Sequence, residues 1–304
     1  MRHLLSISDL DDDELRHLVA RGAEFSRDAV APEVVPLRGK VVGIYFRKTS
    51  TRTRTAFSAG ALRLGARIVG YGPNDLQENT GETIEDTAAV LSGMLDVLVA
   101  RTAGSHAEML AFAAQSRMAV VNAMSAAEHP TQALADLTTM LGHFGDVEGL
   151  RVLYVGEGNN TAAALALALA RFPGVELHLR TPPGYGLDPE VLHTAEVSAK
   201  GNQACVVERH DMANLPPVEV MYTSRWQTTG TAKRDPNWRD TFVPFRVDED
   251  VVAGSPGAVF MHDLPAHRGE EVTGSVLDGP ASIAFAQAEN KYHSARAVLE
   301  WCGS

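Results

Sequence analysis

Short apolar runs alternate with helical patterns along the whole of this chain. The runs are Val41–Phe46, Ala66–Tyr71, Asp96–Arg101, Met118–Asn122, Arg151–Gly156, Glu176–Arg180, Ala204–Glu208, Glu219–Thr223 and Ala258–His262. Alternating strands and helices are typical of an α/β fold with parallel sheets. Because the series restarts near residue 150, the sequence predicts two parallel-sheet α/β domains.

Helical patterns flank the predicted strands. Ser8 and the acidic residues after it predict a capped helix start, followed by Leu15, Leu18 and Val19 at helical spacing. The last helix, about Ala281 to Trp301, is long and amphipathic enough to pack across a domain surface. Polar residues gather at strand ends in both halves. Since ligands bind at the carboxyl ends of strands in open sheets, the sequence predicts an interdomain active-site cleft.

The bulk composition restricts the classes of function. The chain has 304 residues and a formal net charge of -11, which argues against a basic nucleic-acid surface and against binding to an anionic membrane. The two cysteines, Cys205 and Cys302, have no metal-ligand spacing and fit a reducing compartment. No signal-peptide pattern and no apolar run of transmembrane length is present, so we expect a cytoplasmic protein.

The segment Ser50–Arg54 follows the predicted strand Val41–Phe46 and precedes a helical pattern. Backbone N–H groups and the positive end of the helix dipole favour an anion at such a place. Two guanidinium groups and three hydroxyls suit a phosphate better than a carboxylate. A first turn that is merely capped and solvated is the alternative, and the segment alone does not decide between them.

Further polar clusters lie at Arg101-Thr102, Glu128–Gln132, His262–Glu271 and Gln287–His293. Taken singly, each has an ordinary structural explanation. Arg101 can be a surface charge, His129 a packed or capping histidine, and Gln287–His293 an exposed helix face. A metal site at His262 and His267 lacks a clear third ligand at usable spacing, so we predict no metal.

The turn after Val155 contains Gly156 and Gly158, as a dinucleotide-binding loop would. Thr161 replaces the third glycine of that fingerprint, and Arg180 stands where the acidic ribose ligand belongs. The pattern therefore excludes NAD binding. The asparagines that follow, at positions 159 and 160, are better suited to bonding an amino-acid carboxylate or a carbonyl.

Together these segments resemble the aspartate/ornithine carbamoyltransferase family, and the ornithine branch more closely. The matching segments, in the family's order, are Ser50–Arg54, Gly81–Thr83 with Asp86-Thr87, Arg101-Thr102, His129–Asp136, Asn159-Asn160, His262–Pro265 and Gln287–Asn290. The resemblance covers nearly the whole chain.

The resemblance implies a carbamoyl-phosphate domain at residues 1–130, completed by the helix at 281–304, and an amino-acid (acceptor) domain at 131–280. It implies a homotrimer, or a multiple of trimers, with active sites shared between neighbours. The partners are carbamoyl phosphate and a small amine or amino-acid acceptor, with no nucleic acid, no membrane, no cofactor and no metal.

The resemblance also assigns residues by motif position. Those for carbamoyl phosphate are Ser50, Thr51, Arg52, Thr53, Gln77, Arg101, His129, Gln132, Leu264 and Lys291, with Gln77 placed where a neighbouring subunit's loop reaches the site. Those for the acceptor are Asn159, Asn160, Ser224, Arg225, Thr228, Thr229 and Asp263. Leu264 is expected to accept from the carbamoyl NH2 through its backbone carbonyl, beside a cis Leu264-Pro265 bond.

The implied reaction is attack of a neutral amine on carbamoyl phosphate, with release of phosphate. Arg52, Arg101, Thr53 and His129 are the expected donors to the carbonyl oxygen as it becomes negative. Phosphate can take up the amine proton, and Asp263 is a candidate general base. Ornithine is the default acceptor.

The chain departs from the family in the acceptor half. Ser224 replaces the aspartate that pairs with the ornithine α-ammonium, Thr228 and Thr229 replace serine and methionine, and Asp263 replaces a cysteine. Lys291 replaces an arginine that the family has in the last helix, so a point charge takes the place of a bidentate guanidinium. These changes leave open a carbamoyltransferase for a non-ornithine amine, or a weakly active ligand-binding paralogue.

Overall fold

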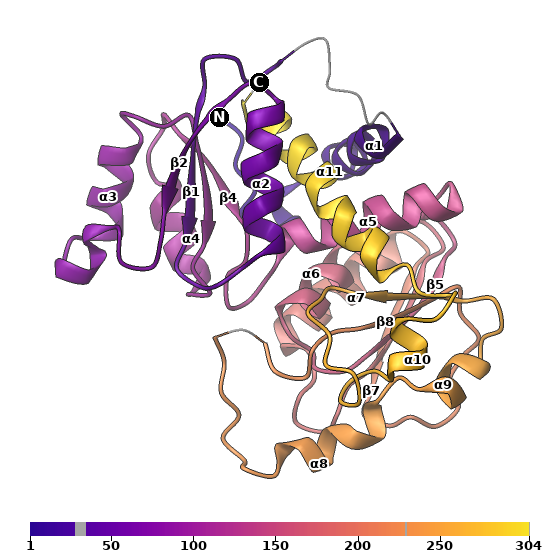
Figure 1. Ribbon diagram of the computed structural model, residues 1–304. Helices are drawn as coiled ribbons and strands as arrows, with labels where there is room; N and C mark the ends of the chain where they lie inside the picture. The colour runs from indigo at the N-terminus through magenta and orange to yellow at the C-terminus, as the bar shows by residue number, and fades with distance from the viewer. Residues whose placement is uncertain (28–34, 229, 304) are drawn as a thin grey trace. The chain divides into compact units, whose positions relative to one another are not determined.

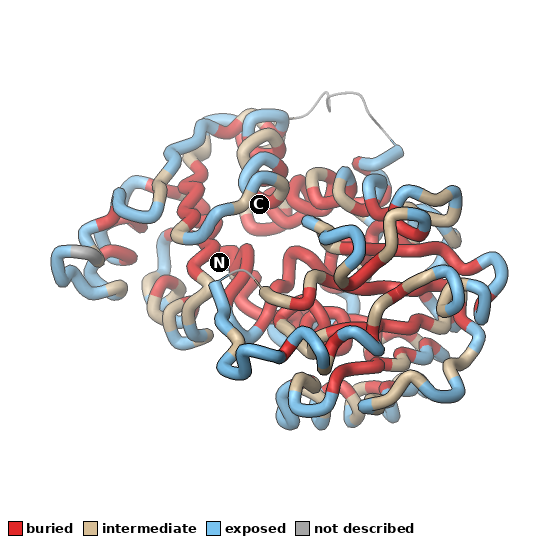
Figure 2. The backbone as a smooth tube through the Cα atoms, turned by 60° about the horizontal axis from the view of Figure 1, so that its bottom comes forward, coloured by how far each residue is buried: buried red, intermediate tan, exposed pale blue. Residues whose placement is uncertain are grey.

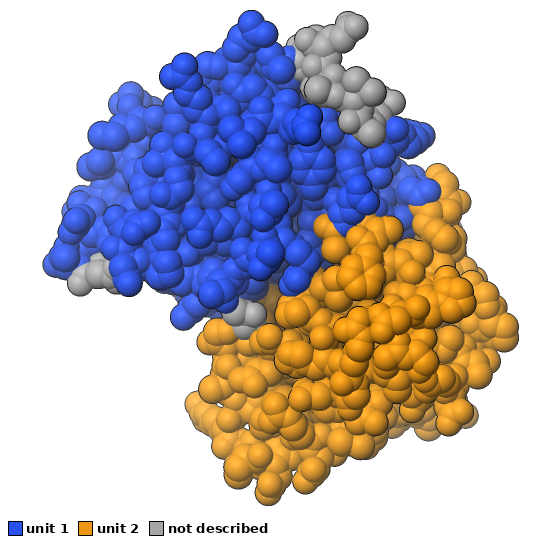
Figure 3. Space-filling model, in the orientation of Figure 1, with its two compact units in different colours: residues 1–142, 289–304 blue, residues 143–288 orange. Residues whose placement is uncertain are grey.

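The computed structural model describes residues 1–27, 35–228 and 230–303 of the chain. These residues form two compact units (Figure 3). Unit 1 comprises residues 1–142 and 289–304, and unit 2 comprises residues 143–288. The predicted boundaries at 130 and 281 fall at the starts of two helices, whereas the units divide within those helices.

Unit 1 contains a parallel sheet in the order β2-β1-β3-β4 (Figure 1). Its strands are β1 (Val41–Phe46), β2 (Arg67–Tyr71), β3 (Val97–Arg101) and β4 (Ala119–Asn122). They match the predicted runs to within a residue at each end. The chain moves outward from β1 to β2 and then returns to the other side as β3, so the strand order reverses between β1 and β3. Ligands bind at the carboxyl ends of strands at such a reversal.

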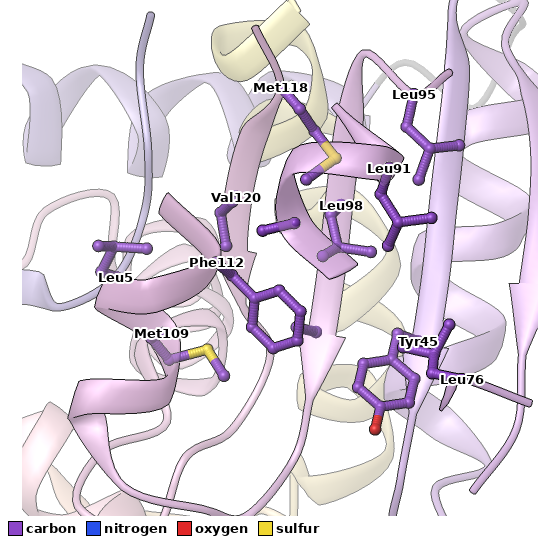
Figure 4. Packing of buried hydrophobic residues seen from close by; sticks show 12 residues of the cluster. Leu5, Tyr45, Leu76, Leu91, Leu95, Leu98, Met109, Phe112, Met118 and Val120 are labelled. Carbon is purple, nitrogen blue, oxygen red and sulfur yellow. The ribbon is translucent and has the colours of Figure 1, made fainter. Parts of the chain in front are cut away.

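Helices cover both faces of this sheet. They are α1 (Asp12–Arg27), α2 (Arg52–Arg63), α3 (Ile84–Leu91), α4 (His106–Ala113), the first part of α5 (Pro130–Phe144) and the last part of α11 (Ala284–Gly303), with short 3-10 helices η1 (Ile7–Asp9) and η2 (Gln77–Thr80). In the core shown in Figure 4, α3 contributes Leu91 and α4 contributes Phe112, which packs edge-on against Tyr45 of β1. On α2, a Cβ at Gly60 would lie 3.3 Å from Arg296 Cγ, so α2 and α11 are in close contact.

The first helix starts later than the sequence predicts. Ser6 caps η1, and α1 begins at Asp12. Asp11 accepts from the Glu14 N–H at 2.7 Å, and the Glu14 carboxylate accepts from the Asp11 N–H at 3.1 Å. This reciprocal capping box places the helix start after Asp11 rather than at Ser8.

Unit 2 contains a parallel sheet in the order β7-β6-β5-β8-β9. Its strands are β5 (Arg151–Val155), β6 (Glu176–Arg180), β7 (Cys205–Arg209), β8 (Val220–Thr223) and β9 (Val259–His262). The helices are α6 (Asn160–Leu169), α7 (Pro189–Gly201), α8 (Trp238–Phe242), α9 (Glu249–Ala253) and α10 (Gly274–Leu277), with η3 at Val243–Phe245. Here the strand order reverses between β5 and β8.

Burial differs among the strands. Strands β3, β4, β5, β8 and β9 are buried almost throughout, whereas β2 is largely exposed and β7 is partly exposed. Figure 2 shows that buried and exposed stretches alternate along the chain. Among the described residues, none of the helices combines the length and hydrophobicity that crossing a bilayer would require.

Candidate active-site residues

The loop between β1 and α2 carries the first candidate site. Thr51 occupies the N-cap position of α2 in a helical conformation, and in the described chain its side chain makes no capping hydrogen bond. Thr53 is buried, Arg52 is partly buried, and Thr51 is exposed. A capped first turn was one explanation of this segment. Thr51 does not cap the helix, so that explanation does not account for this residue, and the anion site stays a prediction.

Strand pairing brings Arg101 to the same place. Arg101 ends β3 and is the register partner of Phe46, the last residue of β1. The Arg47 N–H donates to the Arg101 carbonyl oxygen at 3.0 Å, which extends the pairing past the strands. Arg101 is only 8% exposed. The strand reversal therefore places a buried guanidinium at the strand end that leads into the segment 50–54.

His129 contacts Arg101 directly. Arg101 Nη1 lies 3.3 Å from His129 Nε2, and Thr131 Oγ1 lies 3.2 Å from His129 Nδ1. A guanidinium can only donate, so Nε2 must accept and Nδ1 carries the proton given to Thr131. The sequence predicted His129 as a donor to the carbonyl group. In this arrangement the imidazole accepts from Arg101, and a donor role for either side chain toward a carbonyl group stays a prediction.

The charge state of His129 agrees with that assignment. Burial, reinforced by the positive charges of Arg101 and Lys291, holds the pKa of His129 well below its usual value. The imidazole is therefore neutral at neutral pH. Lys291 is 8% exposed on α11, where the neighbouring Asn290 donates to Thr139 Oγ1 on α5 at 3.0 Å. Lys291 thus belongs to the same cationic cluster as Arg101.

Gln132 lies in the first turn of α5 and is 1% exposed. Its amide nitrogen donates to Asp136 Oδ1 at 2.7 Å. This bond fixes the orientation of the amide, because the NH2 end faces the carboxylate. The carbonyl oxygen of Gln132 is then the end that suits an NH2 group of a ligand.

Gln77 and Leu264 are two further candidates for carbamoyl phosphate. Gln77 is exposed in η2, where Thr80 Oγ1 donates to its side-chain oxygen at 2.8 Å. Arg47 is a residue that the sequence analysis missed. Its guanidinium lies 3.3 Å from the carboxylate of Glu78 in η2 and 2.7 Å from the carboxylate of Glu108 in α4. Leu264 belongs to unit 2, and the Leu264-Pro265 bond is cis, which confirms that prediction.

Glu128, next to His129, gives this region a pH dependence. Burial raises the pKa of Glu128 to about 7, even though the Ile7 N–H donates to it at 2.7 Å and opposes the shift. Because the folded protein binds this proton more tightly than the unfolded chain, the stabilisation is complete below the unfolded pKa near 4.5 and is lost as the pH rises through 7.

We therefore expect Glu128→Gln to remove part of the pH dependence of stability. Between pH 4 and pH 8 the wild type should lose about 3 kcal/mol of unfolding free energy relative to the variant, since each pKa unit is worth about 1.4 kcal/mol. Urea denaturation at several pH values measures this difference. Parallel stability–pH curves for the two proteins would contradict the assignment.

In unit 2, the ends of β5 and β8 carry a neutral hydrogen-bond network. Ser224 Oγ lies 2.6 Å from the Tyr154 hydroxyl and accepts from Asn159 Nδ2 at 3.0 Å. Asn159 also caps α6, since its side-chain oxygen accepts from the N–H groups of Thr161 and Ala162. Ser224 is 1% exposed. The strand reversal thus joins Asn159 and Ser224, which lie far apart in the sequence.

Asp263 lies just beyond β9. Its Oδ2 accepts from Thr161 Oγ1 on α6 at 3.0 Å, and its Oδ1 lies 3.4 Å from His262 Nδ1. Burial alone would lower the pKa of His262, but the carboxylates of Asp263 and Glu271 outweigh burial and raise it. Asn160, at the start of α6, is buried. Asp263 and the asparagines therefore meet at the N-terminus of α6.

The remaining acceptor candidates lie on the segment after β8. The Arg225 Nε–H donates to the Gln227 carbonyl oxygen at 2.7 Å, so the guanidinium folds back onto its own loop. Thr228 Oγ1 contacts Glu157 Oε2 at 3.4 Å. Thr229 lies outside the described residues.

One group of metal-ligand type occurs in the described part of unit 2. Ligand atoms of His267, Glu270 and Glu271 lie within 4.8 Å of one another. Glu271 Oε1 already accepts from the His267 N–H at 2.6 Å and interacts with His262 Nε2 at 3.1 Å, while Glu270 lies 3.8 Å from the Arg239 guanidinium. Protein groups thus already engage Glu270 and the Oε1 oxygen of Glu271.

Family models match both halves of the chain. Residues 2–142 match the model described as aspartate/ornithine carbamoyltransferase, carbamoyl-P binding domain. Residues 148–302 match the model described as aspartate/ornithine carbamoyltransferase, Asp/Orn binding domain.

Individual relatives agree over almost the full length. The ornithine carbamoyltransferase of Nitrosococcus oceani is 37% identical over 300 residues, 98% of this chain and 96% of that protein. The solved structure of ornithine carbamoyltransferase from Pyrococcus furiosus matches with a TM-score of 0.92 at 36% identity, over 98% of this chain and 96% of that one. The solved structure of ornithine carbamoyltransferase from Gloeobacter violaceus matches with a TM-score of 0.89 at 33% identity, over 100% of this chain and 99% of that one. This protein is a member of the aspartate/ornithine carbamoyltransferase family.

Proposed function

We propose that the protein transfers the carbamoyl group of carbamoyl phosphate to the amine of ornithine or an ornithine-like amino acid and releases phosphate. The observation that carries the proposal is the cationic cluster of unit 1, in which the charges of Arg101 and Lys291 both act on the neutral His129. With ornithine the product is citrulline, and the reaction then belongs to arginine biosynthesis.

The donor half of the reaction uses the residues of unit 1. Backbone N–H groups at the start of α2, together with Ser50, Thr51, Arg52 and Thr53, bind the phosphate. Arg101, held by His129, and Lys291 face the growing negative charge. The carbonyl oxygen of Gln132 accepts from the carbamoyl NH2, as does the backbone carbonyl of Leu264.

The chemical step needs no covalent enzyme intermediate. The nitrogen lone pair of a neutral amine attacks the carbonyl carbon, and the C=O electrons move to oxygen, where Arg52 and Arg101 stabilise them. When the carbonyl re-forms, the C–O bond to phosphate breaks. The amine proton passes to the departing phosphate or to Asp263. Preorganised donors and fixed reactants provide most of the rate enhancement.

A panel of amines tests the proposal. Purified protein is incubated with carbamoyl phosphate and each amine, and carbamoylated product is detected by mass spectrometry beside released phosphate. We expect product with ornithine or with a related diamino acid. Absence of product and of phosphate release with every amine would overturn the proposal.

A non-ornithine acceptor is favoured by one observation. At the end of β8 the family's aspartate is replaced by Ser224, whose partners Tyr154 and Asn159 are neutral. An α-ammonium group at this place would find no carboxylate of opposite charge to pair with. A more strongly bound acceptor would instead place its cationic group near Asp263.

We therefore expect Ser224→Asp to lower the KM for ornithine by about tenfold or more, because the Tyr154 hydroxyl and the Asn159 amide can both donate to a carboxylate there. Steady-state kinetics at saturating carbamoyl phosphate measure the change. Ser224→Asn has the same shape without the charge and is the matched control. Equal ornithine KM values for the two variants would show that no ammonium group binds at this position.

We further propose a cytoplasmic homotrimer or multiple of trimers, in which Gln77 serves a neighbouring subunit. Several large apolar side chains of unit 1 are exposed: Leu62, Ile68, Val69, Val90 and Met94. Exposed apolar groups of this kind suit burial in a subunit contact. Light scattering of the purified protein tests the assembly state.

A further inference from the structure

Lys233 has unusual surroundings for a lysine in a loop. Its Nζ lies 4.7 Å from the ring centre of Tyr185, 5.0 Å from Phe242 and 5.6 Å from Trp238. Its side chain is only 5% exposed. Three aromatic rings around one ammonium form a cation–π cage, an arrangement that binds ammonium groups well once they are desolvated.

The cage is completed by a carboxylate. Lys233 Nζ forms an ion pair with Glu157 Oε1, and the Glu157 side chain is also mostly buried. A desolvated ammonium persists only when it is paired, so each partner depends on the other. Glu157 directly precedes Gly158 and Asn159 in the loop between β5 and α6.

A single ammonium thus connects loops from different strands at the carboxyl edge of this sheet. Glu157 follows β5, Tyr185 follows β6, and Lys233 follows β8. A backbone bond supports the first pair of loops, because the Gly158 N–H donates to the Tyr185 carbonyl oxygen at 2.8 Å.

The segment 231–235 that carries Lys233 is also bonded to the acceptor candidates before it. Thr231 donates to the Thr228 carbonyl oxygen through both its N–H, at 3.1 Å, and its hydroxyl, at 2.8 Å. The Gln227 side chain donates to the Thr231 carbonyl oxygen at 2.8 Å. Thr228 in turn contacts Glu157 at 3.4 Å. The ion pair therefore lies at a junction between the segments 224–228 and 157–160.

The junction borders a cavity of about 560 Å³ within unit 2, lined among others by Glu157, Tyr185, Lys233 and Asp235. Loss of the ammonium would leave Glu157, beside this cavity, without its charged partner. Asn159 lies two residues from Glu157 and bonds Ser224. Displacement of Glu157 would thus be transmitted to the acceptor candidates.

We propose that Lys233 is a positioning residue for the acceptor: its ammonium holds Glu157, and through it Asn159 and Thr228, in the arrangement that binds the amine substrate. The inference rests on the proposed function, because it assigns Lys233 to the acceptor half of that reaction. Among the described contacts of Lys233 none involves a candidate for carbamoyl phosphate.

Steady-state kinetics of Lys233→Met test the proposal. The KM for the acceptor should rise about tenfold, whereas the KM for carbamoyl phosphate and kcat at saturating acceptor should stay within about twofold. Glu157→Gln should have the same phenotype, and the double variant should be no worse than the more impaired single variant, because the two groups act as one unit. Lys200→Met, an exposed lysine on α7, is the matched control.

A physical readout separates the outcomes. Hydrogen exchange of the amides at 157–162 should increase in Lys233→Met and not in Lys200→Met. An unchanged acceptor KM in a variant whose exchange has increased would overturn the inference, and so would an equal rise in both KM values. Failure of the wild type to carbamoylate any amine would instead overturn the proposed function, and unchanged exchange at 157–162 in Lys233→Met would overturn the positioning role.

Discussion

Arg52→Ala is expected to reduce carbamoyl transfer by about 10²–10³-fold while the protein remains folded. Arg52 is the first residue of α2, where its guanidinium adds charge to a helix start that Thr51 does not cap. Removing it takes away a donor to the phosphate and to the developing oxyanion. Phosphate release under saturating substrates measures the loss, and circular dichroism with thermal unfolding confirms the fold.

Arg63→Ala is the matched control for this variant. Arg63 is exposed in the last turn of the same helix. The substitution therefore removes the same charge as Arg52→Ala, but at the opposite end of α2. Its activity should stay within about twofold of wild type. If Arg52→Ala retained comparable activity, the assignment of the helix start as the phosphate site would be wrong.

Gly158→Ala should damage unit 2 severely. A Cβ at this position would lie 2.2 Å from the Leu187 nitrogen and 2.3 Å from the Gly186 carbonyl carbon, and both are backbone atoms. Removing this steric clash requires movement of the loop after β5 or of the loop after β6. We expect a loss of about 1–3 kcal/mol of unfolding free energy, measured by urea denaturation, and a raised acceptor KM because Asn159 is displaced.

Gly201→Ala provides the comparison. Gly201 is the last residue of α7, and a Cβ there meets no described heavy atom within 4 Å. Its stability should be unchanged or raised by less than about 1 kcal/mol. If Gly158→Ala were as stable as Gly201→Ala, the loops after β5 and β6 would be able to move apart with little loss of unfolding free energy.

Most strands were predictable because they are buried and therefore apolar along most of their length. A run such as Val97–Arg101 is apolar at nearly every position, which is the pattern of a central parallel strand. The start of α1 was harder to predict. Ser6, Ser8 and Asp11 all have capping side chains, and only the reciprocal bonds between Asp11 and Glu14 select the position.

The candidate site was predictable where position along a strand determined it. Arg101 ends a strand, so a reversal of strand order suffices to bring it beside β1. The direction of the bond between Arg101 and His129 was not predictable, because it depends on burial and on Thr131. Arg47 and Lys233 had no signal in the sequence, since each looks like an ordinary solvated charge. Their partners, among them Glu108 and Tyr185, come from distant segments.

The strand reversal occurs once in each unit, and this has an evolutionary consequence. Apart from Leu264, the residues proposed for the donor belong to unit 1, where Arg52 and Arg101 lie at the reversal between β1 and β3, and those proposed for the acceptor belong to unit 2, mainly at the reversal between β5 and β8. Substitutions such as the serine at position 224 can therefore accumulate in one lineage without disturbing the cationic cluster of the other unit. Under the proposed function, the two units form separate modules, so that a new amine can be adopted while the carbamoyl donor is retained.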